Sequence, residues 1–391
     1  MNNTVYLINC NHYKEVNNKL SELLEMVGGL GKFVKKGEKI ILKPNLLLAA
    51  DPERVVSTHP SLISTLGILL QEHQVKAVLA DSPGSGYVYN ERILRRVYRK
   101  CGMKKAAEAG QVTLNYDTTH NVVSFNKGKL IKRFEIITPV LDAAGVINLC
   151  RLKTHSFMAM SGAVKNNFGV IPGRLKLGYH AALREPDRFA SMLLDLADFI
   201  NPRISIMDAV VGMEGNGPTG GRPCPAGYLL ASTNQLALDV VAGEIMGLPR
   251  DKNPLLKEAE KRGLNPARIE DVVLVGGDIQ SLRIKNYQLP DTFTSWVGFR
   301  GIPDFLLKFL ETLLNQGASL KPKINREKCI GCGACREACP AEVITLDAQN
   351  KAVIKSRGCI RCYCCHEMCT ENAVDLHKGI LYNLLNKQKV I

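Results

Sequence analysis

Nine cysteines lie close together near the carboxy-terminal end of this 391-residue chain, between Cys329 and Cys369. Eight of them form two runs of the pattern C-x2-C-x2-C-x3-C. This spacing wraps three thiolates of one tight loop around the iron corners of a 4Fe-4S cluster, while the fourth thiolate comes from elsewhere. The cysteines therefore predict an iron–sulfur module over residues 321–380 and, with it, electron transfer.

The two runs belong to an internal repeat with a shift of 30 residues, which predicts two similar halves and two 4Fe-4S clusters. When a pair of such runs holds two clusters, the fourth cysteine of each run ligates the other cluster. The predicted ligands are Cys329, Cys332, Cys335 and Cys369 for one cluster, and Cys339, Cys359, Cys362 and Cys365 for the second.

Zinc is the alternative metal, because four-cysteine zinc sites also use C-x2-C pairs. It does not account for a doubled run with an offset fourth cysteine. Thr370 stands where the first run has Pro340, a departure that leaves the eight ligands intact. The ninth cysteine, Cys364, is either a redox-active thiol or a packed spectator, and packing is the commoner fate of a free thiol.

The elements that must position these groups follow from hydrophobic patterning. Short apolar runs alternate with helical stretches over residues 1–290, which predicts an α/β fold with a mostly parallel sheet and flanking helices, followed by a small α+β ferredoxin-like domain. The predicted strands cover residues 39–42, 76–80, 145–149, 204–207 and 272–275. We expect an α/β domain at 1–300, an amphipathic linker helix at 301–320, the iron–sulfur module at 321–380 and a tail at 381–391.

Polar side chains follow four of the predicted strands, where parallel sheets place their ligand sites. If those strands are neighbours, the side chains converge on one site for an anionic or carbonyl-bearing ligand. The predicted catalytic residues are Lys153, His155 and Asp208, and the predicted cofactor-binding residues are Lys43, Asn45, Asp81, Lys165 and Asn166. A histidine at such a site can transfer protons near neutral pH.

Each of these motifs also has a structural interpretation. A loop-capping role for His155 is as frequent as catalysis. The segment 81–86, Asp-Ser-Pro-Gly-Ser-Gly, resembles a phosphate-cradling loop, but it lacks both glycine fingerprints of nucleotide sites and is more typical of a tight turn. The glycine-rich segment 212–221 is either a lid or a plain surface loop.

The same motifs identify a family resemblance that spans nearly the whole chain. The motifs are Leu42-Lys43-Pro44-Asn45, Thr58-His59-Pro60, Asp81-Ser82-Pro83-Gly84, Lys153-Thr154-His155, Val164-Lys165-Asn166-Asn167 and the cysteine-rich string from Cys359. They resemble the uncharacterised family called domain of unknown function 362, here fused to a bacterial-type two-cluster ferredoxin domain. The resemblance implies cluster binding and supplies no established reaction.

Composition narrows the function classes. Lys and Arg exceed Asp and Glu by 51 to 37, but the excess is spread out and only 6% of residues are aromatic, which disfavours nucleic-acid binding. No apolar run reaches the length of a membrane span, and the amino terminus lacks a secretory pattern, so we expect a cytoplasmic protein without membrane contact. The expected partners are a redox protein and an anionic small molecule.

Three function classes remain. The leading hypothesis is an oxidoreductase that passes electrons from the ferredoxin module to a substrate or unknown further cofactor in the α/β domain. The alternative is a non-enzymatic electron-transfer or assembly protein that docks a partner through its α/β domain. A third class is a proton-transfer enzyme remotely similar to lactate racemase, in which the clusters are structural or sensory.

Overall fold

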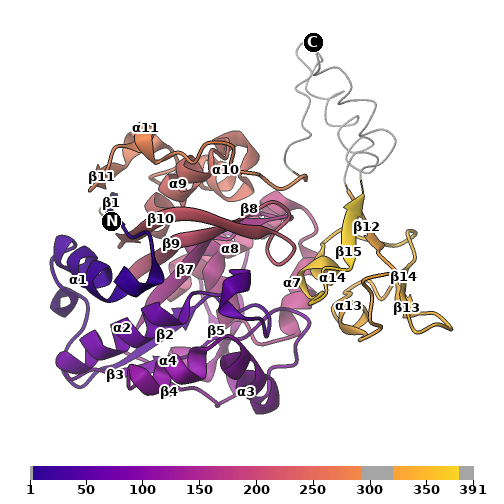
Figure 1. The fold of residues 1–391 in the computed structure, drawn as a ribbon, viewed down its shortest axis with the longest axis horizontal. Helices are drawn as coiled ribbons and strands as arrows, with labels where there is room; N and C mark the ends of the chain where they lie inside the picture. The colour runs from indigo at the N-terminus through magenta and orange to yellow at the C-terminus, as the bar shows by residue number, and fades with distance from the viewer. Residues whose placement is uncertain (1–2, 293–319, 378–391) are drawn as a thin grey trace, which may run out of the picture.

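A computed structural model describes residues 3–292 and 320–377, and its centre is a nine-stranded sheet (Figure 1). Eight strands follow one another in the order β11-β1-β10-β9-β7-β2-β3-β4, and β8 pairs with β7. The strands are β1 (Thr4–Asn9), β2 (Lys39–Pro44), β3 (Lys76–Leu79), β4 (Thr113–Leu114), β7 (Gly145–His155), β8 (Ala159–Met160), β9 (Ile204–Glu214), β10 (Arg222–Ser232) and β11 (Val273–Val275).

The sheet is mostly parallel, which confirms the predicted fold class. The pairs β1–β11, β2–β3, β2–β7, β3–β4 and β7–β9 are parallel, whereas β10 is antiparallel to both of its neighbours. Each of the five predicted strands is present in the structure. A separate hairpin is formed by β5 (His120–Ser124) and β6 (Arg133–Ile137).

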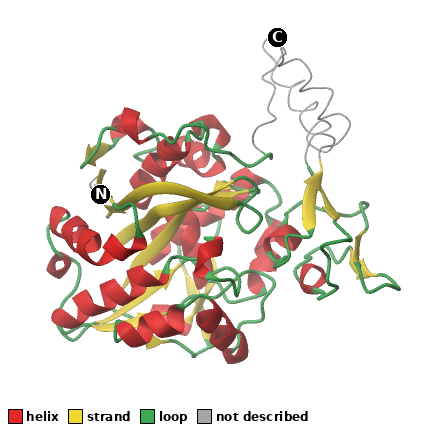
Figure 2. Ribbon diagram, in the orientation of Figure 1, coloured by secondary structure: helices red, strands yellow, loops and turns green. Residues whose placement is uncertain are grey.

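Helices cover both faces of the sheet, as the coloured ribbon shows (Figure 2). Side chains alternate along β2, so Ile40 and Leu42 join one hydrophobic cluster while Ile41 joins another. The first cluster includes α1 (Val16–Met26), α2 (Pro60–Glu72), α3 (Glu91–Lys100) and α4 (Met103–Ala109). The opposite face packs against α8 (Pro186–Ile200), α9 (Gln235–Met246) and α10 (Pro254–Lys261). The other α-helices of residues 3–292 are α5 (Thr138–Leu141), α6 (Gly162–Asn166), α7 (Leu175–Ala182) and α11 (Ile279–Leu282).

Local sequence signals fix where helices begin. His59 caps α2 by accepting a hydrogen bond at Nδ1 from the Ser61 N–H (3.2 Å), and Pro60 occupies the first helical position. Asn90 caps α3 in the same way, accepting from the Ile93 N–H at 2.9 Å. The segment 81–86 therefore joins β3 to a capped helix, as a strand-to-helix turn requires.

Strands β7 and β9 are much longer than predicted, and this changes the place of three site residues. The prediction placed Lys153 and His155 after one strand and Asp208 after another, but all three lie within strands that run to His155 and Glu214. The reason is the hairpin of β9 and β10, whose ladder extends from Ser205–Ser232 to Glu214–Arg222 and supports the outer part of β7 as well.

The ferredoxin-like module has the two-fold repeat that the sequence indicates. Strand β12 (Lys321–Ile324) pairs with β15 (Val374–His377), and β13 (Ile344–Leu346) pairs with β14 (Ala352–Ile354). Each half carries one short helix, α13 (Ala334–Glu337) or α14 (Cys364–Glu367). Positive φ angles recur at the shift of 30 residues, at Gly331 and Arg361, at Gly333 and Tyr363, and at Glu342 and Asn372.

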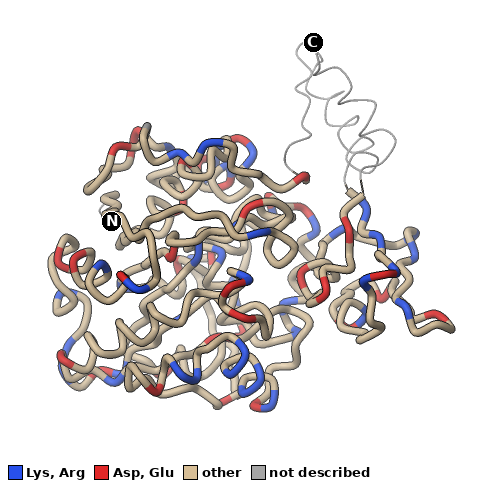
Figure 3. Tube along the Cα trace, in the orientation of Figure 1, with Lys and Arg blue, Asp and Glu red and all other residues tan. Residues whose placement is uncertain are grey.

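The module lies beside the α/β body, next to α7 and the outer end of the β9–β10 hairpin (Figure 1). The predicted linker helix and tail lie outside the described residues. Within residues 3–292 and 320–377, no helix has the length and hydropathy of a membrane span. Lys and Arg alternate with Asp and Glu over the whole described trace, so the basic excess is dispersed (Figure 3).

Candidate functional site

Strands β3, β2, β7 and β9 are consecutive neighbours in the sheet, and this order brings most of the predicted site residues together. Lys43 at the end of β2 and Asp81 just after β3 are fully buried, with Lys43 Nζ 2.5 Å from Asp81 Oδ2. Burial raises the pKa of Asp81 to about 6, although Lys43 opposes the rise. A Cβ atom on Gly169 would lie 2.7 Å from Lys43 Nζ, so the absence of a side chain at Gly169 makes room for this ion pair.

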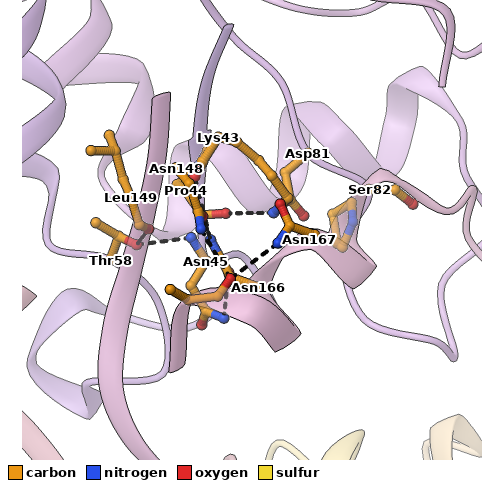
Figure 4. Close-up of polar contacts among 12 residues, drawn as sticks. Lys43, Pro44, Asn45, Thr58, Asp81, Ser82, Asn148, Leu149, Asn166 and Asn167 are labelled. Atoms are coloured by element: carbon orange, nitrogen blue, oxygen red, sulfur yellow. Dashed lines mark hydrogen bonds and ion pairs between the residues drawn. The ribbon is translucent and has the colours of Figure 1, made fainter. Parts of the chain in front are cut away.

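A chain of amides links this pair to β7 (Figure 4). Asn45 donates from Nδ2 to Asn166 Oδ1 (3.0 Å), and Asn166 donates to Asn148 Oδ1 (2.6 Å). Lys153 Nζ donates to Asn45 Oδ1 (2.9 Å) and to the Val56 carbonyl (2.8 Å). Each polar group therefore orients the next. Asn148 was absent from the predicted site because it lies inside a strand that reads as apolar core.

Asp239 on α9 fixes the short helix that carries Lys165 and Asn166. Its buried carboxylate accepts hydrogen bonds from the Ala163 N–H (2.5 Å) and the Val164 N–H (3.0 Å) at the start of α6. Burial raises the pKa of Asp239 to about 7, against the effect of these two donors. The sequence carried no signal for this role, since Asp239 is distant in the chain and stands within a helix.

Asp208 lies in a different group from Lys153. It is fully buried and ion-paired with Arg151 (3.2 Å between Nη1 and Oδ2), and it accepts hydrogen bonds from the Tyr13 hydroxyl (3.0 Å) and the His59 N–H (2.9 Å). Arg151 was missed because the sequence does not distinguish a buried arginine in a strand from an arginine on the exposed face of that strand. The catalytic role expected for Asp208 stays a prediction, and its contacts are those of a structural ion pair.

His155 ends β7 and is buried. Its Nδ1 accepts from the Phe157 N–H (3.1 Å) and the Met158 N–H (3.3 Å), so the neutral ring carries its proton on Nε2. Burial, aided by Lys165, lowers the pKa of His155 to about 3, and the ring is neutral at pH 7. His155 thus caps a turn while it presents Nε2–H to its surroundings, and the catalytic role expected for it stays a prediction.

The cations around His155 are unusual in their burial. Burial lowers the pKa of Lys153 well below its usual value, and Lys165 and Arg151 add to this effect. Burial also lowers the pKa of Lys165 and of Lys176, the latter to about 7. Lys176 Nζ donates to the Ser82 carbonyl and hydroxyl (both 2.9 Å) and to the Pro83 carbonyl (3.0 Å).

The ferredoxin-like module docks onto this site through α14. Cys364, Cys365, His366 and Glu367 are all buried, whereas Arg336 and Glu337 at the equivalent positions of α13 are exposed. Glu367 Oε1 reaches to 3.1 Å from His155 Nε2. Burial alone would raise the pKa of Glu367, but His155, Lys165 and His180 outweigh it and lower the pKa to about 2. Glu367 is thus a site residue contributed by the module.

Hydrogen bonds and small residues complete the junction. His366 Nε2 lies 2.9 Å from the Asn216 carbonyl, and Thr219 donates to the His366 carbonyl (3.1 Å), so the glycine-rich segment 212–221 lies against α14. A Cβ atom on Gly86 would lie 2.9 Å from Ala338 and from Met368 of the module. Gly86, which belongs to the segment that resembles a phosphate-cradling loop, therefore allows the module to approach the α/β domain closely.

The eight predicted cluster cysteines are free thiols that fall into two groups. Burial raises the pKa of Cys335 to about 11, and the thiols that raise it further are Cys369, Cys332 and Cys329. Burial likewise raises the pKa of Cys365, with Cys362, Cys359, Cys335 and Cys339 as its neighbours. Among the described residues, no three metal-binding side chains converge as they would for a single ion. A cubane instead spreads its ligands over separate iron corners, so this donor set fits it.

The fold and the cysteine-rich module define an α/β iron–sulfur protein. Residues 40–244 match the family described as Domain of unknown function (DUF362), and residues 322–345 match a 4Fe-4S binding domain. The chain belongs to the DUF362 family and carries a 4Fe-4S binding domain, as the sequence motifs indicated.

A curated relative covers much of the chain. The thylakoid-associated protein sll1697 of Synechocystis sp. is 35% identical over 279 residues, which is 70% of this chain and 82% of that protein. Among solved structures, the lactate racemase apoprotein from Thermoanaerobacterium thermosaccharolyticum has a TM-score of 0.42 and 12% identity. That match covers 63% of this chain and 57% of the racemase, and it is too distant to carry an argument about the reaction.

Proposed function

We propose that this protein is an oxidoreductase that binds two 4Fe-4S clusters and passes electrons to a substrate or cofactor at the buried junction of its two modules. The observation that carries the proposal is the asymmetric docking of α14. This helix contains the predicted ligand Cys365 and is followed closely by the predicted ligand Cys369, and its Glu367 contacts His155 of the α/β domain. Clusters bound here would supply single electrons at potentials set by their surroundings.

The residues of the α/β domain would bind the acceptor and supply its protons. Lys153 and Lys165 provide positive charge for an anionic substrate, and the amide chain from Asn45 to Asn148 holds Lys153 in place. The Nε2–H of His155 lies 3.1 Å from Glu367 Oε1 and would donate a hydrogen bond to an acceptor bound there. Lys43 and Asp81 neutralise each other, which supports a structural and electrostatic role for that pair.

The outward half of the module suits a redox partner protein. Ile330 is 65% exposed and Cys332 is exposed, whereas their counterparts Ile360 and Cys362 are partly or fully buried against the α/β domain. This exposure also favours the second candidate function, a non-enzymatic electron-transfer protein with a docking surface at this loop. The cytoplasm stays our proposed location, and the name of the Synechocystis relative makes membrane association a second possibility to test.

The two candidates differ in what happens at His155. The protein is purified anaerobically, reduced with dithionite and mixed with carbonyl-bearing carboxylates, while the visible absorbance of the clusters reports reoxidation. Each carbonyl reduced to an alcohol consumes two electrons and two protons. We expect the rate of cluster reoxidation to be about 100-fold lower in H155Q than in wild type, with the iron content unchanged. Equal reoxidation of wild type and H155Q, or none in either, would favour the non-enzymatic candidate.

A further inference from the structure

Three buried polar atoms at the junction have no hydrogen-bond partner among the described residues: His155 Nε2, His180 Nδ1 and Glu367 Oε1. The first and third lie 3.1 Å apart, but their alignment is not that of a hydrogen bond. Buried polar groups are rarely left unsatisfied unless a water, an ion or a ligand completes them. The three atoms thus mark a place where a water, an ion or a ligand would complete the hydrogen bonds.

Lys165 adds positive charge at the same place. No hydrogen bond or ion pair joins Lys165 Nζ to the part of the chain that the structure describes. Lys153, which is nearby, donates only to neutral oxygens. Burial lowers the pKa of Lys165, and the charge of Glu367 is the largest effect that opposes the shift. A half-buried cation without an anion in contact is costly, so this site favours an anionic occupant.

The burial of Glu367 is not shared by its counterpart in the first half of the module. The repeat places Glu337 at the equivalent position of the first half, where the carboxylate is exposed. The two glutamates have the same relation to their cysteines, yet only Glu367 enters the α/β domain. The contact of Glu367 with His155 is therefore a feature of the junction and not of the repeat.

We propose that the group formed by Lys165, His155 and His180 is a carboxylate-binding site, and that Glu367 occupies it as an internal counter-ion until an external carboxylate displaces it. The inference rests on the proposed function in one respect, that the junction accepts an anionic ligand. The inference adds that the ligand is a carboxylate and that Glu367 competes with this ligand for the site. When an external carboxylate binds, Glu367 leaves His155 while the His366 contact with the Asn216 carbonyl still anchors α14.

The test measures acetate binding by isothermal titration calorimetry to the anaerobically purified full chain with its clusters, in buffers matched for ionic strength with chloride. We expect E367Q to bind acetate at least tenfold more tightly than wild type, because glutamine keeps the shape of the side chain and removes the competing charge. E337Q is the matched control and should bind as wild type does. When K165M is added to E367Q, the tighter binding of acetate should be lost.

Equal acetate affinity in wild type and E367Q would overturn the inference, as would a gain that survives K165M or that also appears in E337Q. If E367Q fails to retain its iron, hydrogen exchange of wild type decides: acetate should speed exchange of the amides of residues 364–368 relative to chloride, and an unchanged rate would overturn the inference. Acetate binding is measured without turnover, so the inference can hold even if no carbonyl compound reoxidises the clusters.

Discussion

At the scale of single residues, Lys153 is a buried lysine held by neutral oxygens. Lys153 is 1% exposed and its hydrogen bonds go to an amide and a main-chain carbonyl, so its orientation is fixed without neutralising its charge. A fixed cation of this kind can stabilise negative charge on a bound substrate, because it needs no reorganisation at the moment of reaction.

Replacing Lys153 by methionine should remove this charge while filling the same volume. We expect K153M to slow reoxidation of the reduced protein by carbonyl-bearing carboxylates by about 100-fold, with iron content and unfolding midpoint close to those of wild type. K105Q, on the exposed side of α4, is the control. Unchanged reoxidation in K153M would remove Lys153 from the site.

The carboxyl group of Asp239 should give stability a dependence on pH. Its folded pKa of about 7 lies above the usual value of 3.8, so the folded state binds this proton more tightly than the unfolded state does. The contribution of Asp239 to stability is therefore largest below about pH 4 and is lost as the pH rises through about 7. Urea unfolding of wild type and D239N between pH 5 and 8 should show a decline in wild type that D239N lacks. If the unfolding free energies of wild type and D239N changed with pH in parallel, this role of Asp239 would be contradicted.

At the scale of elements, sequence signals predicted what local patterning controls. The strands and the repeat in the module follow from neighbouring residues, and the caps that the structure shows at His59 and Asn90 are local contacts of the same kind. The length of β7 and the burial of α14 do not, since they depend on strands and modules far apart in the chain. Glu337 and Glu367 illustrate the limit, because they have the same spacing to their cysteines while their burial differs.

Docking of α14 should depend on His366. Its two ring nitrogens lie 2.7 Å from the Val374 carbonyl and 2.9 Å from the Asn216 carbonyl, so H366A removes contacts within the module and across the junction. We expect a loss of about 1–3 kcal/mol in docking free energy, seen as faster iron loss to a chelator. R336A, the exposed counterpart in the first half, should lose iron at the wild-type rate. Equal rates for both variants would show that His366 does not hold the junction.

The ion pair of Lys43 and Asp81 should tolerate no side chain at position 169. A Cβ atom there meets both partners, so G169A should destabilise the α/β domain by about 2 kcal/mol through overpacking. G178A is the matched control, because Gly178 is exposed in α7 and a Cβ atom there meets nothing within 4 Å. It should stabilise the helix by about 0.5–1 kcal/mol. If denaturant unfolding showed G169A to be more stable than G178A, this view of the ion pair would be contradicted.

At the scale of the whole molecule, two modules share one site. The α/β domain contributes Lys153, His155 and Lys165, and the module contributes Glu367 together with the cysteines on either side of it. The inward half of the module is buried against the site, and the outward half presents an exposed loop. Under the proposed function, the buried half would deliver electrons to the site and the exposed half would receive them.

The binding of two 4Fe-4S clusters is tested by measuring iron, acid-labile sulfide and zinc in anaerobically purified protein, together with a reductive titration. Two crossed sets of four cysteines predict about eight irons and eight sulfides per chain, and about two electrons taken up. A content of about four irons and one electron, or stoichiometric zinc in place of iron, would contradict the account.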